Sequence, residues 1–501
     1  MYNIGLLNVK GALPLFENYG YLPTNIVKSD GTVENGKLAH ETLDGIIIPG
    51  GSIMESKSIT PELESEIKKI NDNDGFILGI CAGFQILSNQ VNVGRNSPCP
   101  IIRKGMKLLD VDFDPLINTN QVKADIVEDN TLFTKGLKNT QITGFHCHTY
   151  GKIENRSVPV IYSDIKRSNY KNKSERVLSG VSNDKGNILG TSIHGILDNN
   201  PKIVENILEY IGAENDYKNI KERNKLLQNK IFNEIGVETK TYFTPKNLNK
   251  DTIPPVIMMV GTGSESGKTF LTAGIVGALR KQGVQTYVLK IGPDIRDLTP
   301  SLYINKEPMT EYSSIKIGDI GWMDLKEVLE KIKNKGYDLV IIEGVMSAVT
   351  GLLNKKTPYS TAEIAHAANI PTIMVSSVNK GGIETAGITI QSHIDLLKKL
   401  GIRTKGVILN MTYDKEIVEI VSDYINIHSN ISKDSIWSFS KVKSNNSGFV
   451  PENYLQLEDF TSNAIKLIEE NLDLNKFISL AEKVNFKGYL EFEEISSKYK
   501  N

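Results

Sequence analysis

Short apolar runs alternate with charged, helix-like stretches along the first part of the chain. The runs DGIIIPGG at 44–51 and GFILGICAG at 75–83 contain glycine at their ends, and the charged segment ELESEIKK at 62–69 lies between them. Buried strands that alternate with amphipathic helices are typical of βαβ units, in which helices cover both faces of a parallel sheet. The pattern therefore predicts an α/β domain with a doubly wound parallel sheet.

The same alternation starts again after a polar interruption. The stretch from Pro201 to about Glu234 is rich in Lys and Asn with helical spacing, and TYFTPKNLNKDTIPP at 241–255 has the prolines and polar residues of a linker. A second set of strand candidates follows, namely VIMMVG, TYVLKIG, YDLVIIEG, IPTIMVSS and TKGVILN. They predict a second doubly wound parallel sheet. We expect α/β domains at 1–205 and 255–501, with a helical segment and linker at 206–254.

Composition narrows the class of protein further. A chain of 501 residues is too long for one core, which agrees with two domains. The formal net charge of −1 and the lack of a basic run argue against nucleic-acid or membrane partners and favour a small-molecule substrate. Three cysteines are too few for a disulfide framework, and no apolar run reaches about 18 residues. We therefore expect a cytoplasmic protein.

Cys81 stands between an apolar run and a helical stretch, with Gly79 and Gly83 on either side of it. This G-x-C-x-G arrangement is typical of a nucleophile elbow, a sharp turn between strand and helix that small neighbours tolerate. The amide groups and the positive dipole end of a helix N-terminus favour the thiolate, which is the species that attacks an amide. The alternative is that Cys81 is only a small buried hydrophobic residue.

A partner for such a nucleophile occurs in GNILGTSIHGILDNN at 186–200. This stretch places His194 at the end of another strand candidate, where it could act as general base and then acid. The PGG segment at 49–51 also follows an apolar strand, so its amides could form part of an oxyanion hole. Taken singly, the histidine could be structural and the PGG segment only a turn.

The segments IIIPGG, GICAGFQIL and GTSIHGILDN resemble the class I glutamine amidotransferase domain of the cobyric acid synthase group, over roughly the first 200 residues. The resemblance implies a flavodoxin-like glutaminase in which Cys81 attacks the side-chain amide of glutamine. A glutamyl thioester then forms, and ammonia leaves with His194 as the base. The residues implied in the oxyanion hole or in glutamine binding are Gly50, Gly51, Ala82, Gln85 and His148.

The chain departs from this family in two places. In GFHCHTYG at 144–151, His148 aligns with a family histidine, but His146 replaces the family glutamate. Many class I glutaminases carry a glutamate two residues after the catalytic histidine, whereas this chain has Ile196. We therefore expect a Cys-His dyad, and the sequence does not name a group that orients His194. His146, Cys147 and His148 are a weak pattern for zinc without further spaced ligands.

The stretch VIMMVGTGSESGKTF at 256–270 has the order strand, glycine-rich loop and helix that a phosphate-binding loop requires. Loop amides would bind phosphates, Lys268 would add positive charge, and the Thr269 hydroxyl would ligate magnesium. The predicted nucleotide-binding residues are Thr262, Gly263, Ser264, Glu265, Ser266, Gly267, Lys268 and Thr269. This loop predicts ATP binding.

The variant G-T-x-x-x-x-G-K-T resembles dethiobiotin synthetase and the synthetase domains of cobyrinic acid diamide synthase and cobyric acid synthase. LKIGPDIRD at 289–297, VIIEGVMSAVTGL at 340–352 and STAEIA at 360–365 also resemble segments of that group, with a looser similarity in FVPE at 449–452. The resemblance implies that Thr269, Asp294 and Glu343 hold Mg²⁺. Lys290 would contact phosphate or substrate, and Asn410 would lie near the adenine base.

Together the two resemblances imply glutamine-dependent, ATP-driven amidation of side-chain carboxylates on a corrinoid-like tetrapyrrole, through an acyl phosphate. The domain order is the reverse of that in the group, and GPDIRDL and SSVNKGG replace more typical segments, which leaves divergent substrate recognition open. Two alternatives remain. One is the same chemistry on another acid, such as a cell-wall or biotin-like precursor. The other is a regulatory P-loop ATPase with a glutaminase-like sensor domain. The sequence is compatible with a homodimer under each of these hypotheses.

Overall fold

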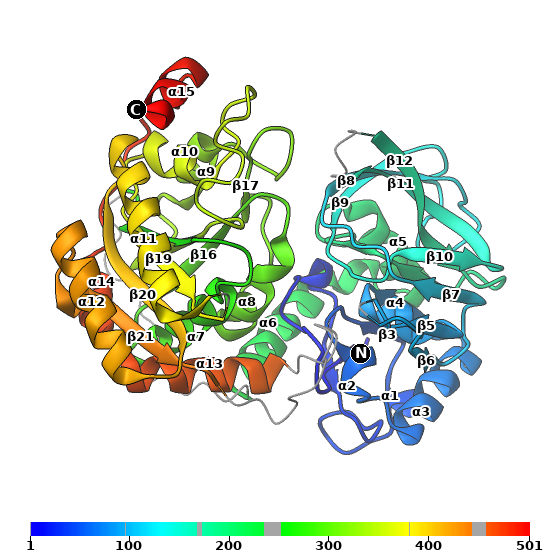
Figure 1. Cartoon of the computed structure of the whole chain (residues 1–501). Coiled ribbons are helices and arrows are strands. Elements are labelled where there is room, and N and C mark those ends of the chain that lie inside the picture. The colour runs from blue at the N-terminus through cyan, green and yellow to red at the C-terminus, as the bar shows by residue number, and fades with distance from the viewer. Residues whose placement is uncertain (1, 96, 168–172, 235–251, 380, 443–456) are drawn as a thin grey trace. The chain divides into compact units, whose positions relative to one another are not determined.

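The computed structural model describes the chain except for residues 1, 96, 168–172, 235–251, 380 and 443–456 (Figure 1). Most of the predicted linker and the FVPE segment at 449–452 lie outside the described residues. The chain divides into two compact units. The first comprises Met1–Gly236, Lys306–Met309 and Gly448–Glu458, and the second comprises Val237–Asn305, Thr310–Ser447 and Asp459–Asn501. The domain boundaries drawn from the sequence stay a prediction.

The first unit contains a ten-stranded sheet with a parallel part and an antiparallel part. The parallel part runs in the order β2 (Asn25–Val27), β1 (Ile4–Leu7), β3 (Gly45–Ile48), β4 (Phe76–Ile80) and β13 (Ile188–Thr191). The antiparallel part continues through β12 (Lys173–Ser182), β11 (Val158–Arg167), β8 (Gln121–Ile126), β9 (Gln141–His146) and β14 (Ile193–His194). A four-stranded sheet joins β10 (Lys152–Asn155), β7 (Val111–Asp114), β5 (Gln90–Asn92) and β6 (Ile102–Lys104).

Both faces of the parallel part are buried, as the glycine-bounded apolar runs predict. On β3, Ile47 belongs to one core cluster with Ile207 of α5 (Pro201–Ile211), because alternate side chains of a strand point to opposite faces. Ile46 belongs to the other cluster with Ile67 of α3 (Pro61–Asp72). The remaining helices of this unit are α1 (Ala39–Thr42), α2 (Ile53–Ser56), α4 (Ala82–Leu87) and α6 (Tyr217–Glu234).

The second unit is built on a seven-stranded sheet in which all neighbours are parallel. Its order is β17 (Ser314–Ile315), β16 (Thr286–Ile291), β18 (Leu339–Glu343), β15 (Val256–Gly261), β19 (Thr372–Ser377), β20 (Thr404–Thr412) and β21 (Ile436–Ser440). Strand β15 lies at the centre of this order and leads into the glycine-rich loop. Because ligands of such sheets bind beyond the carboxyl ends of the strands, this loop is in the expected place for a nucleotide.

The helices of the second unit are α7 (Lys268–Lys281), α8 (Thr299–Asn305), α9 (Leu325–Ile332), α10 (Thr361–Ala367), α11 (Gly382–Lys399), α12 (Lys415–Ser429), α13 (Leu457–Asn471), α14 (Leu474–Ser479) and α15 (Phe492–Lys500). The STAEIA segment is the start of α10. There the Ser360 hydroxyl accepts a hydrogen bond from the Glu363 amide, and the Glu363 carboxylate accepts one from the Ser360 hydroxyl. These bonds satisfy groups at the helix N-terminus, so the segment has a structural explanation.

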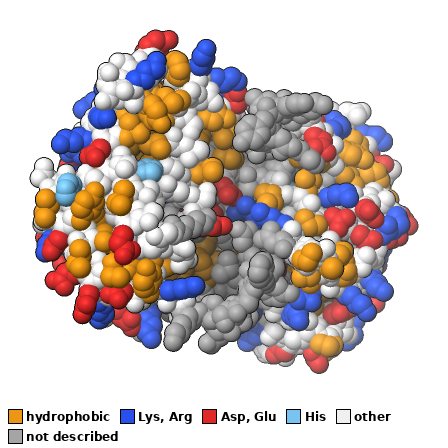
Figure 2. All heavy atoms as spheres, in the orientation of Figure 1, with side chains coloured by type: hydrophobic (Ala, Val, Ile, Leu, Met, Phe, Trp, Pro, Cys, Tyr) orange, Lys and Arg blue, Asp and Glu red, His pale blue; other side chains and the backbone are white. Residues whose placement is uncertain are grey.

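The predicted fold class, two α/β units with large parallel sheets, is confirmed. On the face displayed in Figure 2, basic and acidic side chains are intermixed, which agrees with the near-zero net charge. No helix in the described part of the chain combines the length and apolar composition that crossing a bilayer demands.

Candidate active sites

Cys81 forms the turn between β4 and α4. Its backbone has φ 53° and ψ −106°, a conformation that residues with a side chain rarely adopt. A Cβ at Gly79 would lie 2.7 Å from the backbone of Gly83, and one at Gly83 would lie 2.1 Å from the Ile48 carbonyl oxygen. The close approach of strand and helix therefore demands glycine at both positions. This is the geometry of a nucleophile elbow, and it presents the Cys81 sulfur at the helix N-terminus.

Strand β14 brings His194 to Cys81. Gly50, which follows β3, faces both residues: a Cβ there would lie 3.5 Å from the Cys81 Cβ and 3.6 Å from His194 Nε2. Burial by itself lowers the pKa of His194. Interactions with Cys81 and with the Glu17 carboxylate outweigh burial and raise the pKa to about 10. The imidazole is therefore stabilised as a cation beside the sulfur.

Glu17, from the loop after β1, is a partner of His194 that sequence reasoning missed. Its Oε1 lies 2.6 Å from His194 Nδ1, and its Oε2 accepts a hydrogen bond of 2.7 Å from the Gly195 amide. The imidazole also stacks on Phe145 at 5.2 Å and meets the edge of Phe16 at 5.1 Å. Glu17 is the first acidic residue of the chain, but it stands 177 positions before His194 and no spacing rule connects them.

The other predicted glutaminase residues lie in α4 and directly after β9. Ala82 is the first residue of α4, and the Gln85 side chain donates a hydrogen bond of 3.3 Å to the Tyr150 carbonyl. His148 is buried, with its ring centroid 4.8 Å from that of His146. Burial and the neighbouring histidines hold the pKa of His146 well below its usual value, so His146 is neutral at pH 7.

Two predictions for this region are not settled by the geometry. The oxyanion role of the Gly50 and Gly51 amides stays a prediction, as does glutamine binding by Gln85 and His148. A zinc site at the histidine pair gains no support, because no group of three or more His, Cys, Asp or Glu able to hold a metal occurs among the described residues.

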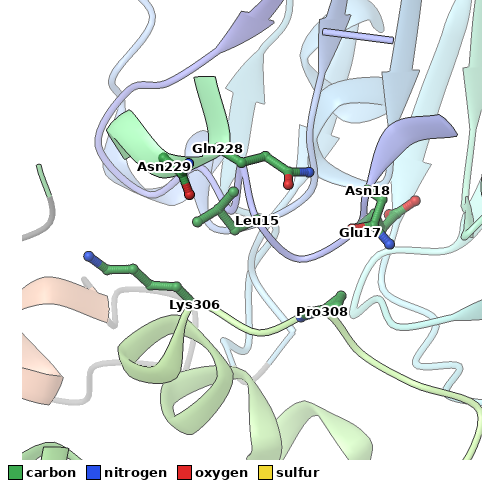
Figure 3. Close-up of a pocket in the computed structure, with 7 residues that line it drawn as sticks. All are labelled: Leu15, Glu17, Asn18, Gln228, Asn229, Lys306 and Pro308. Carbon is green, nitrogen blue, oxygen red and sulfur yellow. The ribbon is translucent and has the colours of Figure 1, made fainter. Parts of the chain in front are cut away.

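The loop that carries Glu17 also borders a pocket of the first unit (Figure 3). Its lining residues are Leu15, Glu17, Asn18, Gln228, Asn229, Lys306 and Pro308. The cavity volume of about 160 Å³ is below the range of about 300–1,000 Å³ that is usual for ligand sites. We therefore assign no cofactor to it.

In the second unit, the glycine-rich loop joins β15 to α7. Gly267 has φ 87°, and a Cβ there would lie 2.1 Å from the Asn410 side-chain nitrogen. That nitrogen donates a hydrogen bond of 2.9 Å to the Ser266 carbonyl, and the Thr262 and Ser376 hydroxyls are 2.8 Å apart. Asn410 and Ser376 therefore brace the loop from the ends of the neighbouring strands. A contact between Asn410 and adenine stays a prediction.

Lys268 is buried at the first position of α7. Its ammonium group donates to the Met346 carbonyl at 3.0 Å and to the Ser266 hydroxyl at 3.2 Å. Burial, together with the nearby charge of Lys290, lowers the pKa of Lys268 to about 8. A triphosphate would restore the charged form, so the site has the electrostatic character of an anion site.

Thr269, Lys290 and Glu343 come together beside this lysine. The Thr269 hydroxyl donates to Glu343 Oε1 at 2.7 Å, and Lys290 Nζ lies 2.9 Å from the same oxygen. The second oxygen, Glu343 Oε2, is buried and has no hydrogen-bond partner within the described residues. An orphaned carboxylate oxygen next to a threonine hydroxyl fits a divalent cation whose other ligands are phosphate oxygens and water.

Asp297, in the short 3₁₀ helix Ile295–Leu298, pairs with Lys290. The distance from Lys290 Nζ to the Asp297 carboxylate is 2.6 Å, and burial raises the pKa of Asp297 to about 6. Asp294 instead pairs with Arg296 at 3.0 Å and its side chain is 44% exposed. Asp297 is thus a second acidic candidate that the sequence prediction left out, although it lies in the same GPDIRDL segment.

Comparison with known proteins adds family information to this geometry. Residues 12–202 match the CobB/CobQ-like glutamine amidotransferase domain, and residues 256–444 match an AAA domain. A cobyrinate a,c-diamide synthase of Limosilactobacillus reuteri is 31% identical over 239 residues, which cover 46% of this chain and 50% of that protein. For the synthase of Dehalococcoides mccartyi the identity is 26% over 239 residues, with 45% and 48% covered.

The chain thus spans about half the length of the curated relatives it matches. Among solved structures, PurLQS from Thermotoga maritima is 20% identical and aligns with 42% of this chain and 99% of its own, with a TM-score of 0.32. The chain joins a CobB/CobQ-like glutamine amidotransferase domain to an AAA domain, and its resemblance to the group of cobyric acid synthase and cobyrinic acid a,c-diamide synthase is confirmed.

Proposed function

We propose that this chain is a glutamine-dependent, ATP-driven amide ligase. The observation that carries the proposal is the occurrence of two chemical sites in one chain. The first unit places Cys81 in a strained elbow beside His194, and the second places Lys268 and Thr269 beside the buried Glu343 carboxylate. The first arrangement suits release of ammonia from an amide, and the second suits phosphoryl transfer.

In the glutaminase half, the Cys81 thiolate would attack the side-chain carbonyl of glutamine. His194 would give a proton to the departing nitrogen, so that ammonia leaves and a glutamyl thioester remains. The same histidine would then take a proton from the water that hydrolyses the thioester. The raised pKa of His194 supports the first step, because the protonated ring is the acid that this step needs.

In the ligase half, a carboxylate must be activated because ammonia cannot displace its oxygen directly. Transfer of the γ-phosphoryl group of ATP to the substrate carboxylate would give an acyl phosphate, and attack by ammonia would give the carboxamide and phosphate. Lys268 and Lys290 would stabilise negative charge on the transferring group. Thr269 and Glu343, with Asp294 or Asp297, would hold Mg²⁺, which supplies charge neutralisation on the phosphates.

The substrate we propose is a corrinoid-like tetrapyrrole acid with side-chain carboxylates. Support comes from the relatives, which are named cobyrinate a,c-diamide synthases. Another small carboxylic acid remains the alternative substrate. We further propose the domain boundaries given above and a cytoplasmic location, the latter because Cys81, Cys99 and Cys147 are all free.

The test measures glutaminase activity, ATP turnover and amide formation with a panel of tetrapyrrole and other carboxylic acids. We expect Cys81→Ala to lose glutamine-dependent amidation and to keep ammonia-dependent amidation, whereas Lys268→Ala should lose both. A Cys81→Ala variant with full glutaminase activity would refute the nucleophile assignment. A wild-type protein that converts no glutamine with any acid would instead favour the regulatory ATPase.

A further inference from the structure

The carboxylate of Glu17 holds two consecutive groups of the His194 turn. Oε1 meets the ring nitrogen Nδ1 at 2.6 Å, and Oε2 accepts from the Gly195 amide at 2.7 Å. Both side chains of the Glu17–His194 pair are only 2% exposed. When the carboxylate accepts both bonds, Nδ1 carries the proton in this one. The other ring nitrogen, Nε2, is thereby the one left for exchange of a proton at Cys81.

The loop around Glu17 is itself fixed from the turn that follows His194. Asp198 accepts hydrogen bonds of 2.8 Å from the Asn18 and Gly20 amides. Tyr19 is buried, and its hydroxyl donates to the Leu13 carbonyl at 3.0 Å. The loop and the turn therefore clamp each other: Glu17 reaches the turn, and Asp198 reaches back to the loop. This reciprocal clamp leaves the Glu17 carboxylate little freedom to move away from the imidazole.

A carboxylate and a histidine can also pair for purely structural reasons, and the first unit offers a case in which the histidine is partly exposed. His40 Nδ1 lies 2.5 Å from Glu66 Oε2, a pair that links α1 to α3. The Glu17 pair differs because its histidine also lies, with Cys81, against Gly50 and stacks on Phe145. The Glu66 pair therefore serves as an internal control of the same residue types.

We propose that Glu17 is the positioning residue of the glutaminase site, and that its carboxylate fixes the tautomer and the orientation of His194. It would take the part that a glutamate two residues after the histidine has in many class I glutaminases, where this chain has Ile196. In this chain the carboxylate that contacts the histidine comes instead from the loop after β1. This inference rests on the proposed glutaminase activity, since a positioning role has meaning only where His194 transfers protons.

Three substitutions of Glu17 separate the effects of the charge, the length and the presence of its side chain. Glu17→Ala removes both bonds, and we expect the glutaminase kcat to fall about 10²–10³-fold with a much smaller change in KM. Glu17→Gln keeps an oxygen acceptor without the charge, and Glu17→Asp keeps the charge on a shorter stem. We expect both to recover part of the loss seen with alanine, and Glu66→Gln to retain the wild-type kcat.

A purely structural role of Glu17 predicts a different pattern of losses, so two further measurements are needed to separate it from a positioning role. The first is the pH profile of Cys81 alkylation by iodoacetamide. In Glu17→Ala we expect the rate at pH 7 to fall at least about tenfold, because the imidazolium that stabilises the thiolate is lost. Groups near His194 that could contribute are Cys81, His146, Tyr19 and Asp198. The second readout is ammonia-dependent amidation, which should stay at the wild-type level in every variant.

Each outcome supports or overturns the positioning role of Glu17. A Glu17→Ala protein with wild-type kcat and an unchanged alkylation profile would overturn the inference. Equal losses in Glu17→Ala and Glu66→Gln, matched by equal losses of melting temperature, would assign Glu17 a structural role. If Glu17→Ala does not fold, wild-type kcat and an unchanged alkylation profile in both Glu17→Gln and Glu17→Asp would overturn the inference. If the wild type lacks glutaminase activity, the proposed function fails, while the alkylation profile still tests whether Glu17 controls the Cys81–His194 pair.

Discussion

Substitution of Gly50 by alanine perturbs the glutaminase site by one methyl group. The new Cβ would lie 2.7 Å from His194 Cε1, whereas ordinary contacts begin at 3.4 Å, so the ring must move by about 0.7 Å. Phe145, Phe16 and Glu17 confine the ring on its other sides. The imidazole therefore leaves its position beside Cys81. Since a misplacement of about 1 Å can cost about 10²-fold, we expect kcat to fall about 10–100-fold, or about 1.4–2.7 kcal/mol.

The assay is steady-state glutamine hydrolysis, with thermal unfolding measured in parallel. Gly136→Ala is the matched control, because no atom lies within 4 Å of its added Cβ while its φ of 73° imposes backbone strain. We expect this control to be less stable by about 1 kcal/mol and to keep its full glutaminase activity. A Gly50→Ala protein with wild-type kcat would refute the placement of His194 against Gly50. A parallel loss of ammonia-dependent amidation would show that the substitution acts through unfolding.

Two further predictions follow from the pKa values. The pKa of Lys268 is about 8 without nucleotide, and phosphate favours the charged amine, so ATP binding near pH 9 should take up a proton. Calorimetry in buffers of different ionisation enthalpy should detect this uptake in the wild type and not in Lys268→Met. The folded pKa of His194, about 10, exceeds the unfolded value of about 6.5, so its stabilisation is complete below pH 6.5 and is lost as pH rises through 10. Urea unfolding of the first unit between pH 6 and 10.5 should show that decline, and Cys81→Ser should show less of it.

The elbow at Cys81 and the loop before Lys268 are short segments whose order of strand, glycines and helix is visible in the sequence, although Gly83 and Gly267 also meet distant residues. The two parallel sheets are readable because strands buried on both faces form continuous apolar runs. Ile46 and Ile47 of β3 illustrate this, since they enter opposite core clusters.

The parts that the sequence does not predict depend on long-range packing. Glu17 meets His194 because the loop after β1 and the turn after β14 hydrogen-bond to each other, and no periodicity links positions so far apart. The antiparallel strands β8, β9, β11 and β12 carry alternating or mixed patterns that a search for buried parallel strands passes over. The distinction between Asp294 and Asp297 depends on how the 3₁₀ helix after β16 turns each carboxylate, and both stand in the same segment.

The central claim is that nitrogen released at Cys81 becomes the amide of an acid activated at the site of Lys268. The most direct measurement supplies glutamine with an isotopically heavy side-chain nitrogen, together with ATP, Mg²⁺, a tetrapyrrole acid and ordinary ammonium, and determines the isotope in the purified amide by mass spectrometry. We expect a heavy amide in the wild type, a light amide in Cys81→Ala and no amide in Lys268→Ala. A light amide in the wild type, or an amide formed by Lys268→Ala, would contradict the central claim.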